Sequence, residues 1–262
     1  MNNKNDISHS KTIRQSLAEL SQAINRTLSR DFVEQIKAVF EKLGEYFCEI
    51  LKAAKISLDR LPAELQQLIP LLADRGWFVS DEIPVSILPD LKKQFELKNL
   101  EKVDEYMANC IREIAPFILS SAIKEFPRRT EILSAAFKAH DAKEYALSIP
   151  VLLIQSEGVC QDILSVKLFS KKKGVPVTKA ATKPLSNDPL TEAMLSPMMI
   201  GCGITANENE RQKYPEAFNR HEILHGIDVE YASEINSLKA ISLLGYMVTT
   251  VAGAASKETS VA

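Results

Sequence analysis

The sequence DFVEQIKAVFEKLGEYFCEILKA, residues 31–53, repeats its apolar side chains at steps of three and four residues. The positions with this spacing are Phe32, Ile36, Val39, Leu43, Phe47 and Ile50. An α-helix has 3.6 residues per turn, so these side chains share one helix face. The same periodicity begins near Thr12, with an interruption at residues 29–31, and it predicts a long helical N-terminal section.

Helical spacing continues through most of the chain. Pro62 is expected to open a second helix that Gly76 closes, and a connector with Trp77 in the core runs to Pro89. Further helices are predicted over residues 90–125 with a kink at Pro116, over 128–140, over 143–155 with a bend at Pro150 and a turn at 156–158, and over 160–169. Residues 170–188 predict a loop, and later helices are expected to start at Asp188 or Thr191, at Asn219, and at Ser233 or Asn236.

The fold class predicted from this pattern is all-α. The chain has only nine glycines, and almost no segment alternates apolar and polar residues with a period of two. We expect a helical N-terminal region at residues 1–89 and a helical bundle at residues 90–256. At 262 residues the chain is long enough to bury a sizeable core.

Composition points to a soluble protein in a reducing compartment. A hydrophobic content of 45% and a charged content of 25% are ordinary for globular proteins. The four cysteines form no Cys-x-x-Cys pair, which argues against a zinc knuckle and a disulfide framework. Residues 241–255 are the most apolar run, and they are shorter than the roughly 20 residues that span a bilayer. We therefore expect a cytoplasmic protein without a membrane segment.

Chemistry concentrates in FNRHEILHG, residues 218–226, which holds two of the four histidines. Cleavage of an RNA phosphodiester by its own 2′-hydroxyl needs a proton acceptor, a proton donor and positive charge on the phosphate. Histidine suits proton transfer, and arginine offers paired donors with a permanent charge. Arg220 and His225 supply these groups. They lie about 140° apart on an ideal helix, so a two-fold dimer would bring one copy's histidine to the other's arginine.

The same residues permit a zinc hypothesis, because His221 and His225 share a helix face and Glu222 has the position of a general base. A third ligand is needed, and the nearby acids Asp228, Glu230 and Glu234 do not have the usual spacing. The segment also lacks an upstream strand to bind extended substrate.

A purely structural interpretation stays open as well. Glu222 would then be a capping-box acid after Asn219, and His225 would interact with the helix dipole before Gly226.

The stretch Asn219 to Gly226 resembles the signature of HEPN domains. In that family an arginine, a polar residue (Asn, Asp or His), three further residues and a histidine form the motif. Arg220, His221 and His225 match it, and the sequence from Tyr231 to Ala240 also resembles the segment downstream of the motif in bacterial members. The resemblance covers roughly the C-terminal half of the chain.

The HEPN resemblance implies a helical bundle that forms a homodimer and cleaves RNA without a metal or cofactor, in toxin or antiphage defence. Arg220 and His225 would be catalytic, and His221 would be the supporting polar residue. Many members carry an acidic residue on an earlier helix that approaches the motif, and Glu157 is our candidate, with Asp162 second. Some members are inactive and bind nucleotides or partners, so a non-catalytic interaction module is the alternative.

Three other features are assigned lesser roles. His140 is interpreted as a helix C-terminal residue, and the stripe Met194, Met198 and Met199 as core or dimer interface. The lysines of the predicted loop are interpreted as a solvated segment that could contact RNA phosphates. These lysines are Lys171, Lys172, Lys173, Lys179 and Lys183.

Overall fold

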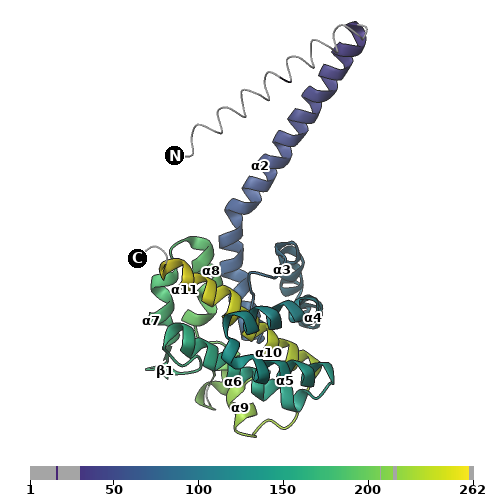
Figure 1. Ribbon diagram of the computed structural model, residues 1–262. Helices are drawn as coiled ribbons and strands as arrows, with labels where there is room; N and C mark the ends of the chain where they lie inside the picture. Colours follow the sequence, from purple (N-terminus) through teal and green to yellow (C-terminus); the bar gives the residue numbers. More distant parts are fainter. Residues whose placement is uncertain (1–15, 17–29, 207, 215–216, 260–262) are drawn as a thin grey trace. The chain divides into compact units, whose positions relative to one another are not determined.

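The computed structural model describes residue 16 and residues 30–206, 208–214 and 217–259 (Figure 1). The chain divides into two compact units, Met1–Arg60 and Leu61–Ala262. The predicted boundary at residue 89 differs from this division, because Leu68, Leu72 and Trp77 are buried in the core of the second unit. The connector around Trp77 is thus an integral part of that core.

In the first unit, the described residues belong to helix α2 (Arg30–Asp74), whose last residues, from Leu61 on, lie in the second unit. Val39, Phe40 and Leu43 are exposed on it. The helix predicted over residues 12–28 lies outside the described residues except for Ser16, which is helical. Pro62 does not open a new helix, because α2 continues through it. A proline removes one helical hydrogen bond, but its fixed φ is compatible with a helix.

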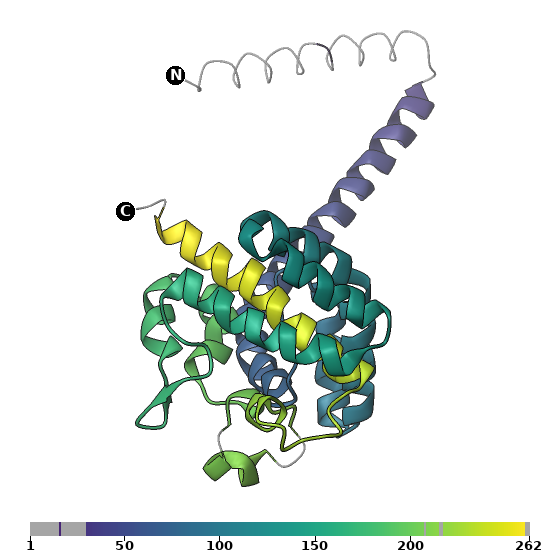
Figure 2. The same ribbon diagram turned by 60° about the horizontal axis from the view of Figure 1, so that its bottom comes forward.

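The second unit is built around a helical rod made of α10 (Glu234–Tyr246), the π-helical turn η6 (Met247–Val251) and α11 (Ala252–Thr259). Figure 2 shows this rod in yellow, among the teal and green helices. Every residue of α10 from Ser237 to Tyr246 is buried, because the segment is apolar on nearly all its faces. A Cβ at Gly245 would lie 2.7 Å from Cδ1 of Ile118, so glycine allows the close packing of α4 on α10.

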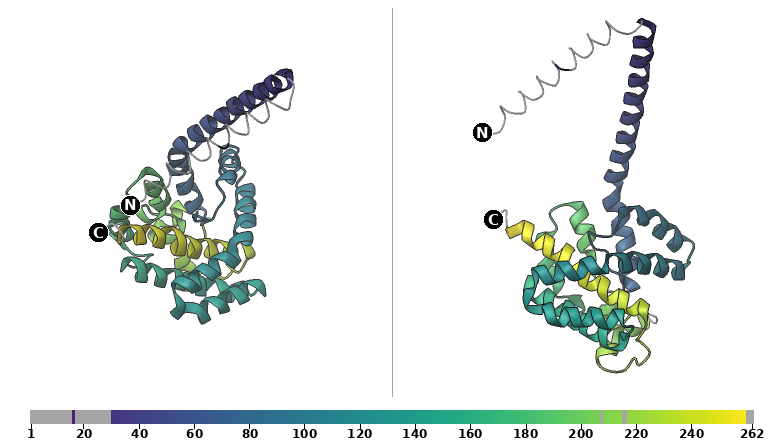
Figure 3. Two further views of the ribbon diagram at one scale, coloured as in Figure 1. Left: turned by 45° about the horizontal axis from the view of Figure 1, so that its top comes forward. Right: turned by 45° about the vertical axis from the view of Figure 1, so that its right-hand side comes forward.

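The other helices of this unit cover the rod (Figure 3). α4 (Leu100–Glu125) and α6 (Tyr145–Leu164) pack directly on α10. α5 (Thr130–Asp141) packs on α6 and α4, and α3 (Leu88–Glu96) packs on α4. The remaining elements are α7 (Thr178–Thr182), α8 (Pro189–Met199), α9 (Arg220–Leu224), the strands β1 (Lys171–Lys172) and β2 (Val175–Pro176), and the 3₁₀ turns η1 (Val85–Ile87), η2 (Pro127–Arg129), η3 (Lys183–Leu185), η4 (Gly203–Thr205) and η5 (Glu208–Lys213).

This architecture confirms the all-α prediction, since one two-stranded hairpin is the sheet content of the described residues. Two helix starts were predicted correctly: Asp188 caps α8 and Ser233 caps α10 through side-chain hydrogen bonds. Gly76 closes α2 with a φ of +87°, a value that glycine adopts without strain. Trp77 is fully buried, as expected, and its indole donates to Asp104 over 2.7 Å.

α4 continues through Pro116 and α6 through Pro150, as predicted. Other local predictions were wrong. The predicted turn at residues 156–158 is regular helix. Gly158 instead makes room for Arg129, whose guanidinium would clash with a Cβ there. The predicted loop at residues 170–188 contains the hairpin and α7. The helical spacing of residues 128–140 places Ile132 with Leu133, Ala136 and Phe137 on the inward face, yet Ile132 is 43% exposed.

Two helices of the described residues are long and apolar enough, by length and composition alone, to cross a membrane. They are α6 and the rod segment Glu234–Glu258, which is longer than the apolar run seen in the sequence. The most apolar window of the rod is 78% buried inside the unit, as is usual for the central helix of a folded domain, so the test is weak evidence for a membrane span.

Candidate functional site

The short helix α9 is held at its start by Asn219, which is 3% exposed. The side-chain Oδ1 accepts a hydrogen bond from the backbone N–H of Glu222 over 3.0 Å, which is the predicted N-cap. Its Nδ2 donates to the carbonyl oxygens of Gly203 and Ala206, each over 3.0 Å. One buried amide therefore fixes α9 to the η4 turn.

The other end of α9 is closed by the backbone. Helix geometry ends at Leu224, and Gly226 adopts a φ of +70°. The N–H groups of Ile227 and Asp228 donate to the carbonyl oxygen of Glu222 over 2.8 and 3.2 Å. The predicted glycine stop is thus confirmed, and it leaves His225 at the exposed end of the helix.

Arg220 leaves α9 toward α6. Its Nη2 lies 3.2 Å from Oε2 of Glu157, and both side chains are 26% exposed. The guanidinium carbon lies 5.0 Å from the centre of the Phe169 ring, a distance at which a cation is attracted to an aromatic face. The Nε of Arg220 is buried and has no hydrogen-bond partner among the described residues. The structure therefore brings Glu157 to Arg220 and leaves one arginine donor unused.

Asp162, the second acidic candidate, is held elsewhere. Its carboxylate accepts from Nη2 of Arg129 over 2.7 Å, and the same arginine donates to Gln155 over 2.8 Å. Of the two acidic candidates on α6, Glu157 therefore pairs with Arg220 of the motif and Asp162 pairs with Arg129.

The rings of His221 and His225 contact each other, with their centres 4.4 Å apart and their planes tilted by 53°, as expected for residues four apart on a helix. His225 is exposed and His221 is half-buried. Within the described part of the chain, no hydrogen bond or ion pair joins Arg220 to either ring. One copy of the chain thus presents two imidazoles that contact each other, and an arginine that is hydrogen-bonded to neither of them.

Glu222 does not have the free position that a general base in a zinc site requires. Its Oε1 lies 2.7 Å from Nε of Arg211, a residue of η5. Among the described residues, no three His, Cys, Asp or Glu side chains converge as a metal site would need. The third ligand required by the zinc hypothesis is therefore missing from the described surroundings of His221 and His225.

The lysine-bearing segment begins two residues after Phe169, so the hairpin of β1 and β2 starts beside Arg220. Lys171 forms an ion pair of 2.5 Å with Glu210 and is largely buried. Lys172, Lys173, Lys179 and Lys183 are exposed. Four of the five lysines therefore present positive charge to solvent, and Lys172 and Lys173 lie within the hairpin that follows Phe169.

The remaining candidates belong to the core. His140 is half-buried and its Nδ1 lies 2.8 Å from Oγ of Ser237 on α10, a contact with the central helix rather than with its own C-terminus. Burial lowers the pKa of His140 below its ordinary value. Met198 is buried and Met194 and Met199 are partly buried, so the methionine stripe is core within the unit.

Three cysteines are buried as free thiols: Cys110, Cys160 and Cys202. Burial raises the pKa of Cys160 to about 12 and that of Cys202 to about 11. Such thiols stay protonated near neutral pH, and a protonated thiol is a poor nucleophile. None of the three is placed for catalysis.

Sequence reasoning missed Phe169 and Arg211 as neighbours of the motif. Phe169 lies in the segment after α6 and Arg211 lies in η5. Neither residue belongs to α9 or shares its helical spacing. No spacing rule connects them to Arg220 or Glu222. Comparison with protein-family models, with curated proteins and with solved structures found no match.

Proposed function

We propose that this protein is a HEPN-like, metal-independent endoribonuclease that acts as a homodimer. The observation that carries the proposal is the arrangement of Arg220: Glu157 and Phe169 hold its guanidinium 26% exposed, on the short helix that also carries the paired imidazoles of His221 and His225. A partly exposed arginine held in one orientation suits a phosphate. The position of Arg220 at the surface would allow an RNA strand to lie across the site.

The proposed reaction needs only groups of this chain and of the RNA. His225, as the exposed imidazole, would take the proton of the ribose 2′-hydroxyl, whose oxygen then attacks the neighbouring phosphorus. Arg220 would stabilise the additional negative charge on the five-coordinate phosphate. The bond to the 5′-oxygen breaks, and that oxygen would take back the proton held by His225, which returns to its starting form. The products would be a 2′,3′-cyclic phosphate and a free 5′-hydroxyl.

His221 and Glu157 would act as positioning residues. The ring of His221 packs against that of His225, so it restricts the orientations available to the catalytic ring. Glu157 accepts a hydrogen bond from Nη2 of Arg220 and would restrict the orientations of the guanidinium. Exposed Lys172 and Lys173 would bind flanking phosphates, which gives RNA affinity a strong dependence on salt.

We propose a homodimer because no hydrogen bond joins Arg220 to His225 within the described part of one chain. A two-fold axis would place the histidine of one copy opposite the arginine of the other. We expect this assembly in the cytoplasm, in a toxin or antiphage role. The alternative is a non-catalytic interaction module in which the contact of Arg220 with Glu157 is only a structural ion pair.

The decisive experiment incubates the purified chain with RNA in the presence of EDTA. We expect cleavage to persist, and Arg220→Ala and His225→Ala each to reduce it by about 10²-fold or more. Arg112→Ala is the matched control, since Arg112 also forms a half-exposed ion pair, 2.8 Å from Glu234, away from the motif. Product ends must carry the cyclic phosphate, which separates this reaction from many contaminating nucleases.

Mixing the two inactive variants tests the dimer. If the sites are shared between copies, a heterodimer of Arg220→Ala and His225→Ala contains one intact pair and recovers part of the activity. Activity that appears only after addition of zinc would favour the metal hydrolase. A folded protein with no cleavage of any RNA supplied would favour the interaction module.

A further inference from the structure

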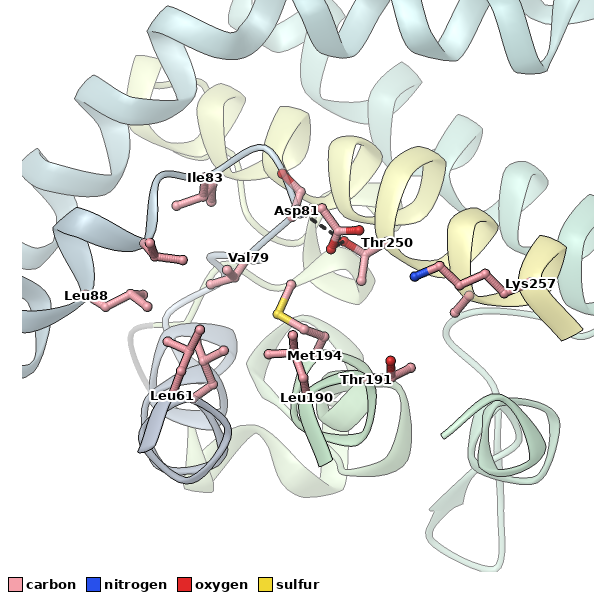
Figure 4. A pocket seen from close by; sticks show the side chains of 14 residues that line it. Leu61, Val79, Asp81, Ile83, Leu88, Leu190, Thr191, Met194, Thr250 and Lys257 are labelled. Atoms are coloured by element: carbon pink, nitrogen blue, oxygen red, sulfur yellow. Dashed lines mark hydrogen bonds between the residues drawn. The ribbon is translucent and has the colours of Figure 1, made fainter. Parts of the chain in front are cut away.

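The second unit contains an apolar cavity of about 240 Å³ on the side of the rod formed by α11 (Figure 4). All its lining residues belong to the unit Leu61–Ala262, and it shares none of them with the candidate site on α9. The walls come from four places in the chain: the end of α2, the connector and start of α3, α8, and the η6–α11 part of the rod. The apolar lining residues are Leu61, Leu65, Val79, Ile83, Val85, Leu88, Leu190, Met194 and Ala254.

The size of the cavity limits the molecules that it can hold. An apolar cavity of about 150 Å³ takes up benzene, and pockets for drug-sized ligands begin at about 300 Å³. The cavity of this protein lies between these values. It therefore fits a molecule with one ring or a short alkyl chain plus a single polar group.

One buried polar atom in the cavity wall lacks a partner. Ser80 is 2% exposed, and its Oγ makes no hydrogen bond in the described part of the chain. A buried hydroxyl without a partner costs free energy, and most such groups in proteins are paired. Ser80 lines the cavity, so a bound molecule with a polar group could supply the missing bond.

The remaining polar groups gather at one end, around Thr250 and Lys257, and the leucines Leu61 and Leu88 lie at the other (Figure 4). The hydroxyl of Thr250 donates to Asp81 over 2.9 Å, and that of Thr191 donates to Asp188 over 2.6 Å. The hydroxyl hydrogens are thus already used. The oxygen of Thr250 also accepts from the backbone N–H of Asp81 over 3.1 Å and keeps one lone pair, and the oxygen of Thr191 keeps the capacity to accept a bond.

Lys257 supplies donors at the same end. Its ammonium group is directed toward Thr250 in Figure 4. Asp81 and Lys257 line the cavity with one negative and one positive charge. Asp188, outside the lining, adds a second negative charge: it accepts from the lining residue Thr191 and interacts electrostatically with Lys257. With two carboxylates and one ammonium, this end does not favour an additional negative charge, and the ammonium disfavours a positive one.

From these contacts we propose that the cavity binds a small uncharged amphipathic molecule, with an apolar chain or ring and a neutral head group such as an alcohol or amide. The apolar part would lie among Leu61, Leu65 and Leu88. The head would accept from Lys257 or Ser80 and donate to a threonine oxygen. The bound molecule would satisfy Ser80 and bury apolar surface, which yields about 25 cal/mol for each Å² removed from water.

A matched series of probes tests the head group: hexan-1-ol, hexanamide, hexanoate and hexylamine, each titrated into the full chain by calorimetry and by thermal melting. We expect both neutral probes to bind at least tenfold more tightly than either charged probe and to raise the melting temperature. Equal or tighter binding of hexanoate or hexylamine would overturn the neutral head, and no binding by any probe would overturn the site.

Two variants locate the binding. Ala254→Leu fills the cavity from α11, and it should weaken binding of hexanamide at least tenfold while the unliganded protein stays folded. Ala252→Leu, on the same helix but outside the cavity lining, is the matched control. Ser80→Ala removes the unpaired hydroxyl, so it should weaken hexanamide binding without lowering the melting temperature. Unchanged binding in both Ala254→Leu and Ser80→Ala would refute the proposal, whatever the folding of either variant.

Discussion

Helices α9 and α10 are neighbours along the chain, yet they are stabilised in different ways. α10 is buried from Ser237 to Tyr246 and packs on α4 and α6, and seven of these ten buried residues are apolar or glycine. α9 has five residues and one buried side chain, Ile223, and it is fixed by an amide cap, a glycine turn and ion pairs from two other segments. Apolar packing thus defines the fold, and directional polar contacts define the candidate site.

This difference separates the expected effects of substitution. In α10 a lost side chain leaves a cavity, and the surrounding helices do not fully relax into it. Around α9 a lost contact releases a few polar groups near the surface, where water replaces part of the interaction. Changes in α10 should therefore reduce stability, and changes at α9 should reduce the order of the site more than the stability of the unit.

The largest effect is expected for Ile241→Ala, because Ile241 is 0% exposed at the centre of α10. Truncation of a fully buried isoleucine costs about 2–5 kcal/mol of unfolding free energy. The matched control is Ile132→Ala on α5, where the side chain is 43% exposed and the expected loss is below about 1 kcal/mol. Urea unfolding followed by circular dichroism measures both. Equal losses would show that the rod is not the centre of the core.

A smaller loss is expected for Asn219→Ala. It removes the N-cap of α9 and leaves the carbonyl oxygens of Gly203 and Ala206 without their donor, at a combined cost of roughly 1–3 kcal/mol. Asn99→Ala is the control, because Asn99 caps the exposed start of α4 with one hydrogen bond of 3.3 Å.

Two further measurements place the effect of Asn219 at the site. Amide hydrogen exchange in residues 220–226 should rise in Asn219→Ala before exchange rises in α10. Asn219→Asp keeps the cap and loses the two donated bonds, so its stability should be intermediate. A uniform rise in exchange across the unit would mean that α9 is part of the core rather than an attached element.

The same contrast explains how far the sequence could predict the structure. Helix starts are encoded locally, so Asp188, Asn219 and Ser233 were identified from the residues next to them. The continuation of α2 through Pro62 was not predicted, because the packing that maintains a helix past a proline comes from distant segments. The turn predicted at residues 156–158 was wrong for the same reason: Gly158 is needed to accommodate the side chain of Arg129, which comes from another part of the chain.

For the site, spacing located Arg220, His221 and His225, and the family resemblance suggested Glu157 as the acid. Phe169 and Arg211 could not be found in this way, because tertiary folding alone brings them to α9. The catalytic roles of these residues, the RNA substrate and the homodimer stay predictions, which the cleavage and mixing experiments test.

The smallest of the expected effects is a dependence of stability on pH, and it should arise at α10 rather than at α9. His140 contacts Ser237 of α10, and burial lowers its pKa, opposed by Asp141 and Glu234 and assisted by Arg112. Below the ordinary histidine pKa of about 6.5 the unfolded chain takes up a proton that the folded chain resists. The stabilisation by neutral His140 is therefore complete above that pH, and it is lost as the pH falls from about 6.5 toward the lowered pKa of the folded form.

The variant His140→Gln removes this titration, so its unfolding free energy should vary less between about pH 7 and pH 5 than that of the unmodified chain. Exposed His225 provides the control, since His225→Gln leaves the contact of His140 with Ser237 unchanged and should keep the slope. Urea unfolding at a series of pH values measures all three proteins. If His225→Gln flattened the profile and His140→Gln did not, the coupling between protonation and stability would lie in α9, and the division between a packed core and a polar site would have to be abandoned.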